Sequence, residues 1–411
     1  MPARSTLTDM AELHLHVGLY KTGTSTIQAA LDTRVDALAT AGVLYPGGGH
    51  RAHRLATYDL LGQRVRGEDV AVAGAFRRLT EEVATYGGPS VLISDEGLGL
   101  CRPRHVRRVV RGFGSRDVHV VIGARDMART VVSAWQQDVM TGSTTEWRDF
   151  IAGVRHPEGG QVPDATAFWV RYDLLRVLDV WSSAVPLDRI TVVTVPRAGA
   201  SPQCLLDRFA AATGLPPDVW GVRAVAQQNV SLGAAEVEVV RRLNLAVGRT
   251  VNQAQLRFVV EQGLRPRLAV ARPRRLRLPD EHRAWAREYA EDLVGELRRR
   301  GVAVVGELED LVPDDRTDGR PPFDEVAPAE LLEAAEAALA ALAVGHGHLF
   351  RRYRRAFLER EGRPASASEV VGSSARAFAF GLRKQLLRRT ADSPLLARAA
   401  RVYVVRTAGR R

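Results

Sequence analysis

The chain has 411 residues, of which 45% are hydrophobic and 26% are charged, and its formal net charge is +11. This length and hydrophobic content are typical of a globular protein with one large domain or two modest ones. The sequence contains no apolar run of the roughly 18 residues that a membrane-spanning helix needs, and its first residues lack the apolar core of a signal peptide. We therefore expect a cytoplasmic protein without a transmembrane segment.

The positive charge is concentrated at the C-terminal end. Residues 350–411 contain 16 basic and four acidic residues, hence a net charge of +12, which leaves a charge of −1 for the rest of the chain. The two cysteines, Cys101 and Cys204, lie far apart and outside any CxxC or cysteine–histidine pattern. We therefore expect two buried thiols and neither a disulfide nor a metal site.

The first predicted strand leads into a glycine-containing turn. Residues 13–31, LHLHVGLYKTGTSTIQAAL, combine an apolar strand, a turn rich in hydroxyl side chains and the start of a helix. Residues 42–50 predict a short second strand that is interrupted by proline and three glycines. Residues 90–98, SVLISDEGL, form an apolar run that ends in Asp95 and Glu96. This pattern is typical of a buried parallel strand whose C-terminal end faces a site.

The later elements continue the alternation of strands and helices. In chain order they are a strand (117–126), a helix (127–140), a helix (166–185), a strand (188–199), a helix (201–216), a helical region (230–300) and a short strand (301–306). Such alternation predicts an α/β fold with a central, mostly parallel sheet flanked by helices. In this fold the site lies at the C-terminal ends of the strands, here after residues 17, 94 and 124.

A charged and proline-rich segment, residues 312–325, is the predicted linker. We expect an α/β domain over residues 11–313 and a helical, Arg-rich extension over residues 314–411. Apolar residues interleaved with arginines in this extension fit a helix that lies on the anionic inner face of a membrane. A solvated tail, or an arm that packs onto a partner subunit in a homo-oligomer, fits the same composition.

The turn after the first strand is a predicted phosphate site. A strand that runs through a glycine turn into a helix directs free backbone N–H groups and the helix dipole at one anion. The Walker A form places its lysine directly after the second glycine, whereas Lys21 precedes Gly23. Lysine occurs only at positions 21 and 384, against 56 arginines. A compact ammonium can approach a reacting oxygen in a way that a planar guanidinium cannot.

The order Lys21, Thr22, Gly23, Thr24, Ser25, Thr26 resembles the phosphosulfate-binding loop of sulfotransferases that use 3′-phosphoadenosine 5′-phosphosulfate, PAPS. The form HxGxxKTGTS, here His16 to Ser25 and followed by Gln28, is similar to bacterial members of this family. The family binds the 3′-phosphate with an arginine at a strand end and a serine about eight residues later, and Arg125 and Ser133 have this spacing. A guanidinium fork and a hydroxyl group suit the charge and geometry of a phosphate.

The resemblance extends through weaker motifs over residues 11–313, although the RKGxxG segment of cytosolic animal members is missing. It implies a P-loop three-layer fold and transfer of a sulfuryl group from PAPS to a hydroxyl, or less readily an amine, with release of 3′-phosphoadenosine 5′-phosphate, PAP. It implies no required metal. Lys21 to Thr26 would hold the phosphosulfate, Lys21 would also act in catalysis, and Arg125 and Ser133 would hold the 3′-phosphate. The acceptor would be a carbohydrate, a glycolipid or a secondary metabolite.

The family's catalytic base is a glutamate or a histidine. Glu96 is our first candidate and Asp95 the second, although either carboxylate can instead cap the turn that follows. His50 and His53 come after the GGGH turn, where they can face the acceptor or make structural hydrogen bonds. We retain His53 as a further catalytic candidate.

Two other functions fit part of the sequence. A P-loop kinase or NTPase that uses ATP–Mg²⁺ is one, because residues 91–96, VLISDE, resemble a Walker B strand. The position of Lys21 counts against it. A non-enzymatic protein that binds nucleic acid through its basic tail is the other, but the tail has no known nucleic-acid recognition motif, so we expect no specific nucleic-acid partner.

Overall fold

The structure, a computed structural model, describes residues 11–64, 69–114, 116–159, 162–221, 232–248, 250–268, 276–314 and 326–360. The chain divides into two compact units, Met1–Ala338 and Leu339–Arg411, and the division falls within the last described helix. The Arg-rich residues 361–411 and most of the predicted linker lie outside the described residues.

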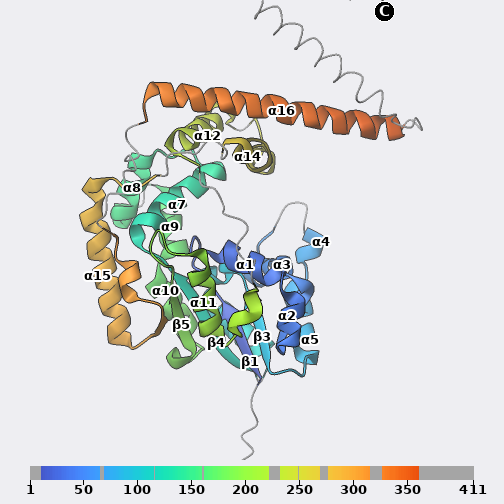
Figure 1. Ribbon diagram of the computed structural model, residues 1–411, viewed down its shortest axis with the longest axis vertical. Coiled ribbons are helices and arrows are strands. Elements are labelled where there is room, and N and C mark those ends of the chain that lie inside the picture. Colours follow the sequence, from blue (N-terminus) through green and yellow to red (C-terminus); the bar gives the residue numbers. More distant parts are fainter. Residues whose placement is uncertain are drawn as a thin grey trace, which may run out of the picture. The chain divides into compact units, whose positions relative to one another are not determined.

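The centre of the first unit is a parallel sheet (Figure 1). Its strands are β1 (Glu12–His16), β2 (Val43–Leu44), β3 (Ser90–Ser94), β4 (Asp117–Ala124), β5 (Ile190–Thr194) and β6 (Ala303–Val305). They lie in the order β2-β3-β1-β4-β5-β6, and every neighbouring pair is parallel. The α/β fold with a parallel sheet is therefore confirmed.

Helices fill most of the segments between the strands. The α-helices are α1 (Thr24–Asp32), α2 (Val35–Thr40), α3 (His50–Leu61), α4 (Asp69–Val72), α5 (Ala75–Thr85), α6 (Pro103–Gly112), α7 (Met127–Met140), α8 (Trp147–Arg155), α9 (Pro163–Tyr172), α10 (Leu174–Ser182), α11 (Pro202–Thr213), α12 (Ala234–Val247), α13 (Gln253–Phe258), α14 (Arg265–Leu268), α15 (Arg283–Arg300) and α16 (Pro328–Arg360). Two shorter segments border the site, the 3₁₀ turn η2 (Glu96–Leu100) and the π-helical segment η6 (Val259–Leu264).

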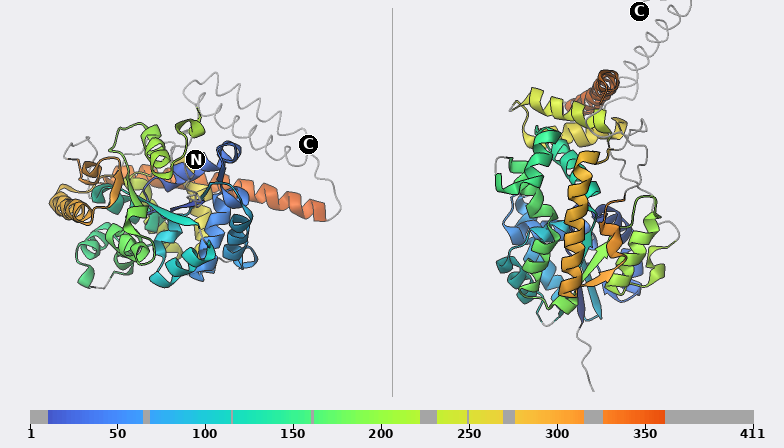
Figure 2. Two further views of the ribbon diagram at one scale, coloured as in Figure 1. Left: turned by 90° about the horizontal axis from the view of Figure 1, so that it is seen from below. Right: turned by 90° about the vertical axis from the view of Figure 1, so that its left-hand side faces the viewer.

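Both faces of the sheet are covered, so the strands are buried on both sides (Figure 2). Leu13 and Leu15 of β1 point to the face that α3, α5, α6, α10 and α15 cover. The other face packs against α1, α2 and α11, where Phe209 is fully buried. Because side chains alternate along a strand, His14 and His16 belong to this second face.

Two helix boundaries show how single residues set the element limits. The helix expected over residues 166–185 is two helices, because Asp173 accepts the backbone N–H of Arg176 at 3.1 Å and so starts α10. The helix expected over residues 201–216 is confirmed as α11. The Ser201 hydroxyl accepts the N–H of Gln203, and the helix ends at Gly214 with a φ of 65°.

α7 is held rigidly by the helices around it. Trp135 is 1% exposed and its ring lies 5.8 Å from that of Trp147 on α8. The Asn244 side chain of α12 donates a hydrogen bond to the carbonyl of Val139 at 2.7 Å. The aromatic pair and the hydrogen bonds that the Asn244 NH₂ group donates to the Val139 and Ser143 carbonyls fix the position of α7.

Cys101 is buried, as expected, whereas Cys204 is only half-buried, and both are free thiols. Within the described ranges, no helix combines the length and the apolar character needed to cross a bilayer.

Candidate active site

The predicted site residues meet at the C-terminal ends of three adjacent strands. β1 ends at His16, and its two neighbours in the sheet, β3 and β4, end at Ser94 and Ala124. The chain passes from one side of β1 to the other between β3 and β4, so this point is where the strand order reverses. Ligands of open parallel sheets bind in the crevice outside such a point.

The turn after β1 is tied to β4 by backbone hydrogen bonds. The Val17 N–H donates to the carbonyl of Val121 and the Leu19 N–H to that of Gly123, both at 2.9 Å. Inside the turn, the buried Thr22 hydroxyl donates to the Leu19 carbonyl at 2.6 Å. The turn therefore has one defined shape against the sheet.

Gly23 brings this turn to the start of α1. Its φ is +83°, and a Cβ at this position would lie 2.3 Å from a methyl carbon of Leu205. Only glycine fits here. The first backbone N–H groups of a helix form the positive end of its dipole, and in α1 the third of them, that of Thr26, donates to the Gly23 carbonyl at 2.9 Å. Ser25 is exposed at this end of the helix.

Lys21 lies half-buried in the turn, with a left-handed φ of 64°. Its Nζ donates to Oε1 of Gln137 on α7 at 2.8 Å. Burial, together with the nearby cations Arg265 and Arg125, lowers the pKa of Lys21 to about 8. The ammonium is thus a cation in a desolvated, positive environment, which an incoming anion would stabilise.

Arg125 and Ser133 are brought together, as the spacing predicts. Arg125 follows β4, and its Nη1 donates to the Lys21 carbonyl at 3.1 Å and to the Ser133 hydroxyl at 3.4 Å. The Ser133 hydroxyl itself donates to the carbonyl of Arg129 at 2.8 Å. Among the described residues, the buried Nε of Arg125 has no acceptor. Burial also lowers the pKa of Arg125 to about 10. A buried donor without a partner beside the turn is the kind of group that an anionic ligand satisfies.

Glu96 stands on the opposite side of the turn, at the end of β3. Its Oε2 accepts a hydrogen bond from Nε2 of Gln28 on α1 at 2.8 Å. The backbone of Gly18 comes so close that an added Cβ would lie 3.2 Å from the Cα of Glu96. Glu96 is half-buried, and it lies against the backbone of the turn at Gly18 and is hydrogen-bonded to α1.

Asp95 has a different position and role. It is 4% exposed, and its Oδ1 accepts the N–H of Gly97 at 2.9 Å, so it caps the η2 turn. Burial, together with the charge of the neighbouring Glu96, raises the pKa of Asp95 to about 7. The two carboxylates that follow β3 are therefore distinguished by their surroundings: one is a buried cap, the other faces the turn.

We expect Asp95→Asn to change the pH dependence of stability. Between its ordinary pKa of 3.8 and about 7, the folded wild type keeps a proton on Asp95 that the unfolded chain releases. Raising the pH through this window therefore destabilises the wild type but not the variant, whose amide oxygen can still accept the Gly97 N–H. Melting temperatures of both proteins from pH 4 to pH 8 test this. The variant's advantage should widen with pH, and a constant difference would contradict the assigned position of Asp95.

His53 is buried with both ring nitrogens in use. Nδ1 accepts the N–H of Ser94 at 3.2 Å, and Nε2 donates to the carbonyl of Pro46 at 2.9 Å. Burial lowers the pKa of His53 to about 4. The ring thus has no free nitrogen for the acid–base role that the sequence left open.

His50 pairs with Asp32. Nowhere in the described part of the chain do three His, Cys, Asp or Glu side chains gather in a way that could hold a metal ion.

Several site residues were not identified from the sequence. Gln137 lies four residues after Ser133, on the same face of α7, so helical spacing from the second motif could have indicated it. Arg265 and its ion-pair partner Glu261, 2.8 Å apart, both influence the pKa of Lys21. They come from η6 and the start of α14, where the sequence carries no recognisable signal.

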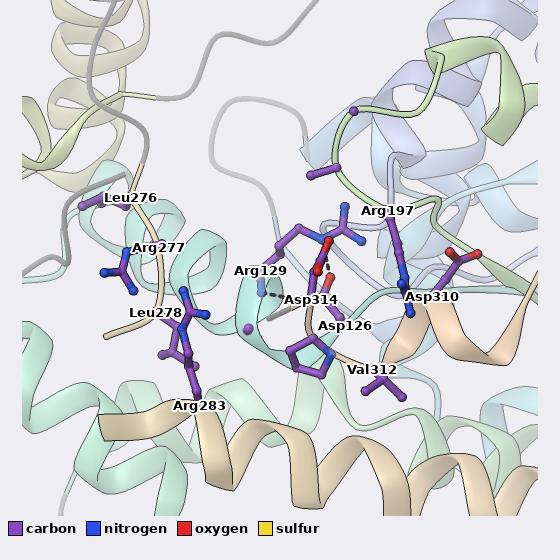
Figure 3. A pocket seen from close by; sticks show the side chains of 14 residues that line it. Asp126, Arg129, Arg197, Leu276, Arg277, Leu278, Arg283, Asp310, Val312 and Asp314 are labelled. Carbon is purple, nitrogen blue, oxygen red and sulfur yellow. Dashed lines mark hydrogen bonds and ion pairs between the residues drawn. The ribbon is translucent and has the colours of Figure 1, made fainter. Parts of the chain in front are cut away.

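A cavity of about 380 Å³ opens next to the N-terminus of α7. Figure 3 shows Arg129, joined to Asp126, between Arg277 and Arg283 on one side and Arg197 on the other. The Nη1 of Arg129 also donates to the Pro196 carbonyl at 3.0 Å. The cavity lies beyond the ends of β4 and β5, and its lining begins at Asp126, the residue after Arg125. No residue of the turn at 17–26 lines it.

No model of a known protein family and no curated protein matches the chain. Among solved structures, the chain is similar to a sulfotransferase from Alicyclobacillus acidocaldarius, with 14% sequence identity and a TM-score of 0.36. The match covers 57% of this chain and 92% of that chain. The assignment of an activity therefore rests on the residues of the site.

Proposed function

We propose that the chain is a sulfotransferase that uses PAPS as its donor. The observation that carries the proposal is the contact between the two motifs, in which the Arg125 guanidinium lies 3.1 Å from the Lys21 carbonyl with Ser133 beside it. The two residues are 104 positions apart in the sequence, yet the Arg125 guanidinium contacts the Lys21 backbone and its charge acts on the Lys21 ammonium. This supports a single ligand with an anion at each end, as PAPS has.

The electrostatics of the site fit such a ligand. Lys21 and Arg125 are both partly desolvated cations with lowered pKa values, and the Arg125 Nε has no acceptor among the described residues. The neighbouring cavity of about 380 Å³ is in the size range of small-molecule sites and would accommodate the adenosine end. The turn would then hold the phosphosulfate, and Arg125 with Ser133 the 3′-phosphate.

The proposed chemistry assigns one role to each side of the turn. Glu96 would accept the proton of the acceptor hydroxyl while a bond forms between that oxygen and the sulfur. The bond from the sulfur to the 5′-phosphate oxygen breaks at the same time, and Lys21 stabilises the charge that develops on this leaving oxygen. Gln28 and Gln137 hold the two reacting side chains, each by a hydrogen bond of 2.8 Å. The acceptor we propose is a hydroxyl of a carbohydrate, a glycolipid or a secondary metabolite.

A thermal-shift comparison of PAP, ADP and ATP–Mg²⁺ tests the donor. A ligand that binds only the folded state stabilises it by RT ln(1 + [L]/Kd) and so raises the melting temperature. We expect PAP to stabilise the protein most, because only PAP has both the 5′- and the 3′-phosphate. Stabilisation by ATP–Mg²⁺ with no response to PAP would overturn the proposal.

Stabilisation by ATP–Mg²⁺ alone would favour the kinase or NTPase alternative, and one structural observation supports that alternative. β3 lies directly beside β1 and ends at Ser94, so that Asp95 follows it where a Walker B aspartate would stand. However, Asp95 is committed to capping η2, and its raised pKa opposes the charge that a magnesium site needs.

We expect Arg125→Ala to weaken PAP binding about 10- to 100-fold, the range for loss of a charge-assisted hydrogen bond to phosphate. Calorimetry with PAP and with AMP measures this. AMP lacks the 3′-phosphate, so its affinity should change by less than about threefold, and the wild type's preference for PAP should largely disappear. If Arg125→Ala loses affinity for PAP and for AMP equally, Arg125 does not bind the 3′-phosphate.

A further inference from the structure

An apolar stripe runs along α16 and is exposed among the residues that the structure describes. The exposed fractions are 62% for Leu332, 67% for Leu339, 46% for Leu349, 57% for Phe350, 71% for Tyr353 and 50% for Phe357. At 3.6 residues per turn, these six side chains fall within about 100° of the helix circumference. An exposed apolar surface of this extent marks an interaction site in a protein that folds in water.

The spacing of the stripe is that of a helix–helix seam. Leu332, Leu339, Leu342, Leu349 and Tyr353 follow one another at intervals of 7, 3, 7 and 4 residues. Apolar residues whose spacings alternate between three and four, so that two successive spacings add up to seven, occupy the a and d positions of a coiled coil. The partner that suits this face is therefore another α-helix with a matching seam.

The charges on α16 are segregated between its two halves. Residues 328–343 contain three acidic residues and no lysine or arginine, whereas residues 344–360 contain five arginines and one glutamate. The acidic residues are Glu330, Glu333 and Glu336, and the arginines are Arg351, Arg352, Arg354, Arg355 and Arg360. The helix therefore has an acidic half and a basic half on one continuous apolar stripe.

We propose that α16 pairs antiparallel with α16 of a second copy of this chain, around a two-fold axis near Gly345. In this register Glu336 lies opposite Arg354 of the partner subunit. Leu339 meets Phe350 of the partner subunit, and Leu332 meets Phe357 of the partner subunit, so the stripe is complementary to itself. A two-fold interface requires this self-complementarity.

Other arrangements fit the charges less well. A parallel pair would place the five arginines of one copy against those of the other, and like charges at neighbouring positions are destabilising. An anionic membrane would attract the basic half of the helix and repel the acidic half. The inference does not depend on the proposed enzymatic function, since no residue of the site lies on α16.

A charge-exchange experiment tests the register. The oligomeric state of the full chain is measured by sedimentation equilibrium for the wild type, for Glu336→Arg, for Arg354→Glu and for the double variant. Each single reversal acts twice in a two-fold dimer and should weaken dimerisation about tenfold, and the double variant should restore it. A monomeric wild type at about 100 μM, or a double variant that stays as weak as the single ones, would overturn the proposal.

Cysteine cross-linking tests the direction of the helices independently. With the axis near Gly345, position 346 lies close to its own counterpart, whereas position 332 is remote from its own. Mild oxidation should therefore give a covalent dimer of His346→Cys and none of Leu332→Cys, and the wild type controls for Cys204. Equal cross-linking of both variants would indicate a parallel pair and contradict the proposal. A monomer that floats with anionic liposomes, and ceases to do so in Phe350→Glu, would overturn it in favour of a lipid surface.

Discussion

Replacing Lys21 by alanine should reduce the rate of sulfuryl transfer about 10²- to 10³-fold, the usual loss when a preorganised charge at a developing oxyanion is removed. The ammonium is held 2.8 Å from Gln137 in a desolvated turn, where its charge acts more strongly than in water. Transfer from PAPS labelled in the sulfuryl group, to an acceptor selected from a panel of sugars, glycolipids and phenols, measures the effect. Rates like those of the wild type would refute the role.

Two matched variants make this result specific. Lys21→Arg keeps the positive charge but spreads it over a planar guanidinium. Its rate of sulfuryl transfer should therefore be nearly as low as that of Lys21→Ala. Gln137→Ala leaves the ammonium in place and should cost less than about tenfold. Because the pKa of Lys21 is lowered to about 8, the ratio kcat/KM should fall as the pH rises through about 8, where the free enzyme loses the required proton. The decline should be absent from the residual activity of Lys21→Ala.

Glu96→Gln should lower turnover about 10²- to 10⁴-fold while PAP binds as tightly as to the wild type. The substitution preserves size and removes the basic oxygen that faces the turn, and Gln28 remains on the same side. Single-turnover transfer and calorimetry with PAP separate the two effects.

Asp95→Asn is the control for this experiment, because Asp95 follows the same strand but caps η2. It should keep turnover within about tenfold of the wild type. The opposite pattern, a crippled Asp95→Asn and an active Glu96→Gln, would make Asp95 the base and contradict the assignment of Glu96.

The order of elements and the location of the site could be predicted from the sequence, because both follow from local patterns. The apolar runs that become β1, β3 and β4 each end at the predicted side chains, and parallel strands bring those ends together. The pairing of Arg125 with Ser133 was expected from the resemblance to the sulfotransferase family, and helix geometry accounts for it, since eight residues from a strand end place a hydroxyl about two helical turns away on the same face.

The roles of Asp95, Glu96 and His53 could not be predicted in this way. Two successive carboxylates after a strand are alike in sequence, and the η2 turn decides which of them is buried against the Gly97 N–H. Both ring nitrogens of His53 are hydrogen-bonded to backbone groups, the Ser94 N–H and the Pro46 carbonyl. Backbone groups are present at every position, so the sequence does not indicate which of them a side chain will contact. Such distinctions arise from the packing of segments that are distant along the chain.

The central claim is that the Lys21 turn and Arg125 clasp the two ends of one nucleotide. A crystal structure of the protein in complex with PAP measures this most directly. We predict the 5′-phosphate on the backbone N–H groups of the turn at Lys21–Thr26, and the 3′-phosphate within hydrogen-bonding distance of Arg125 and Ser133. A PAP molecule that contacts only one of these groups, or that lies outside the crevice between β1 and β4, would contradict the account.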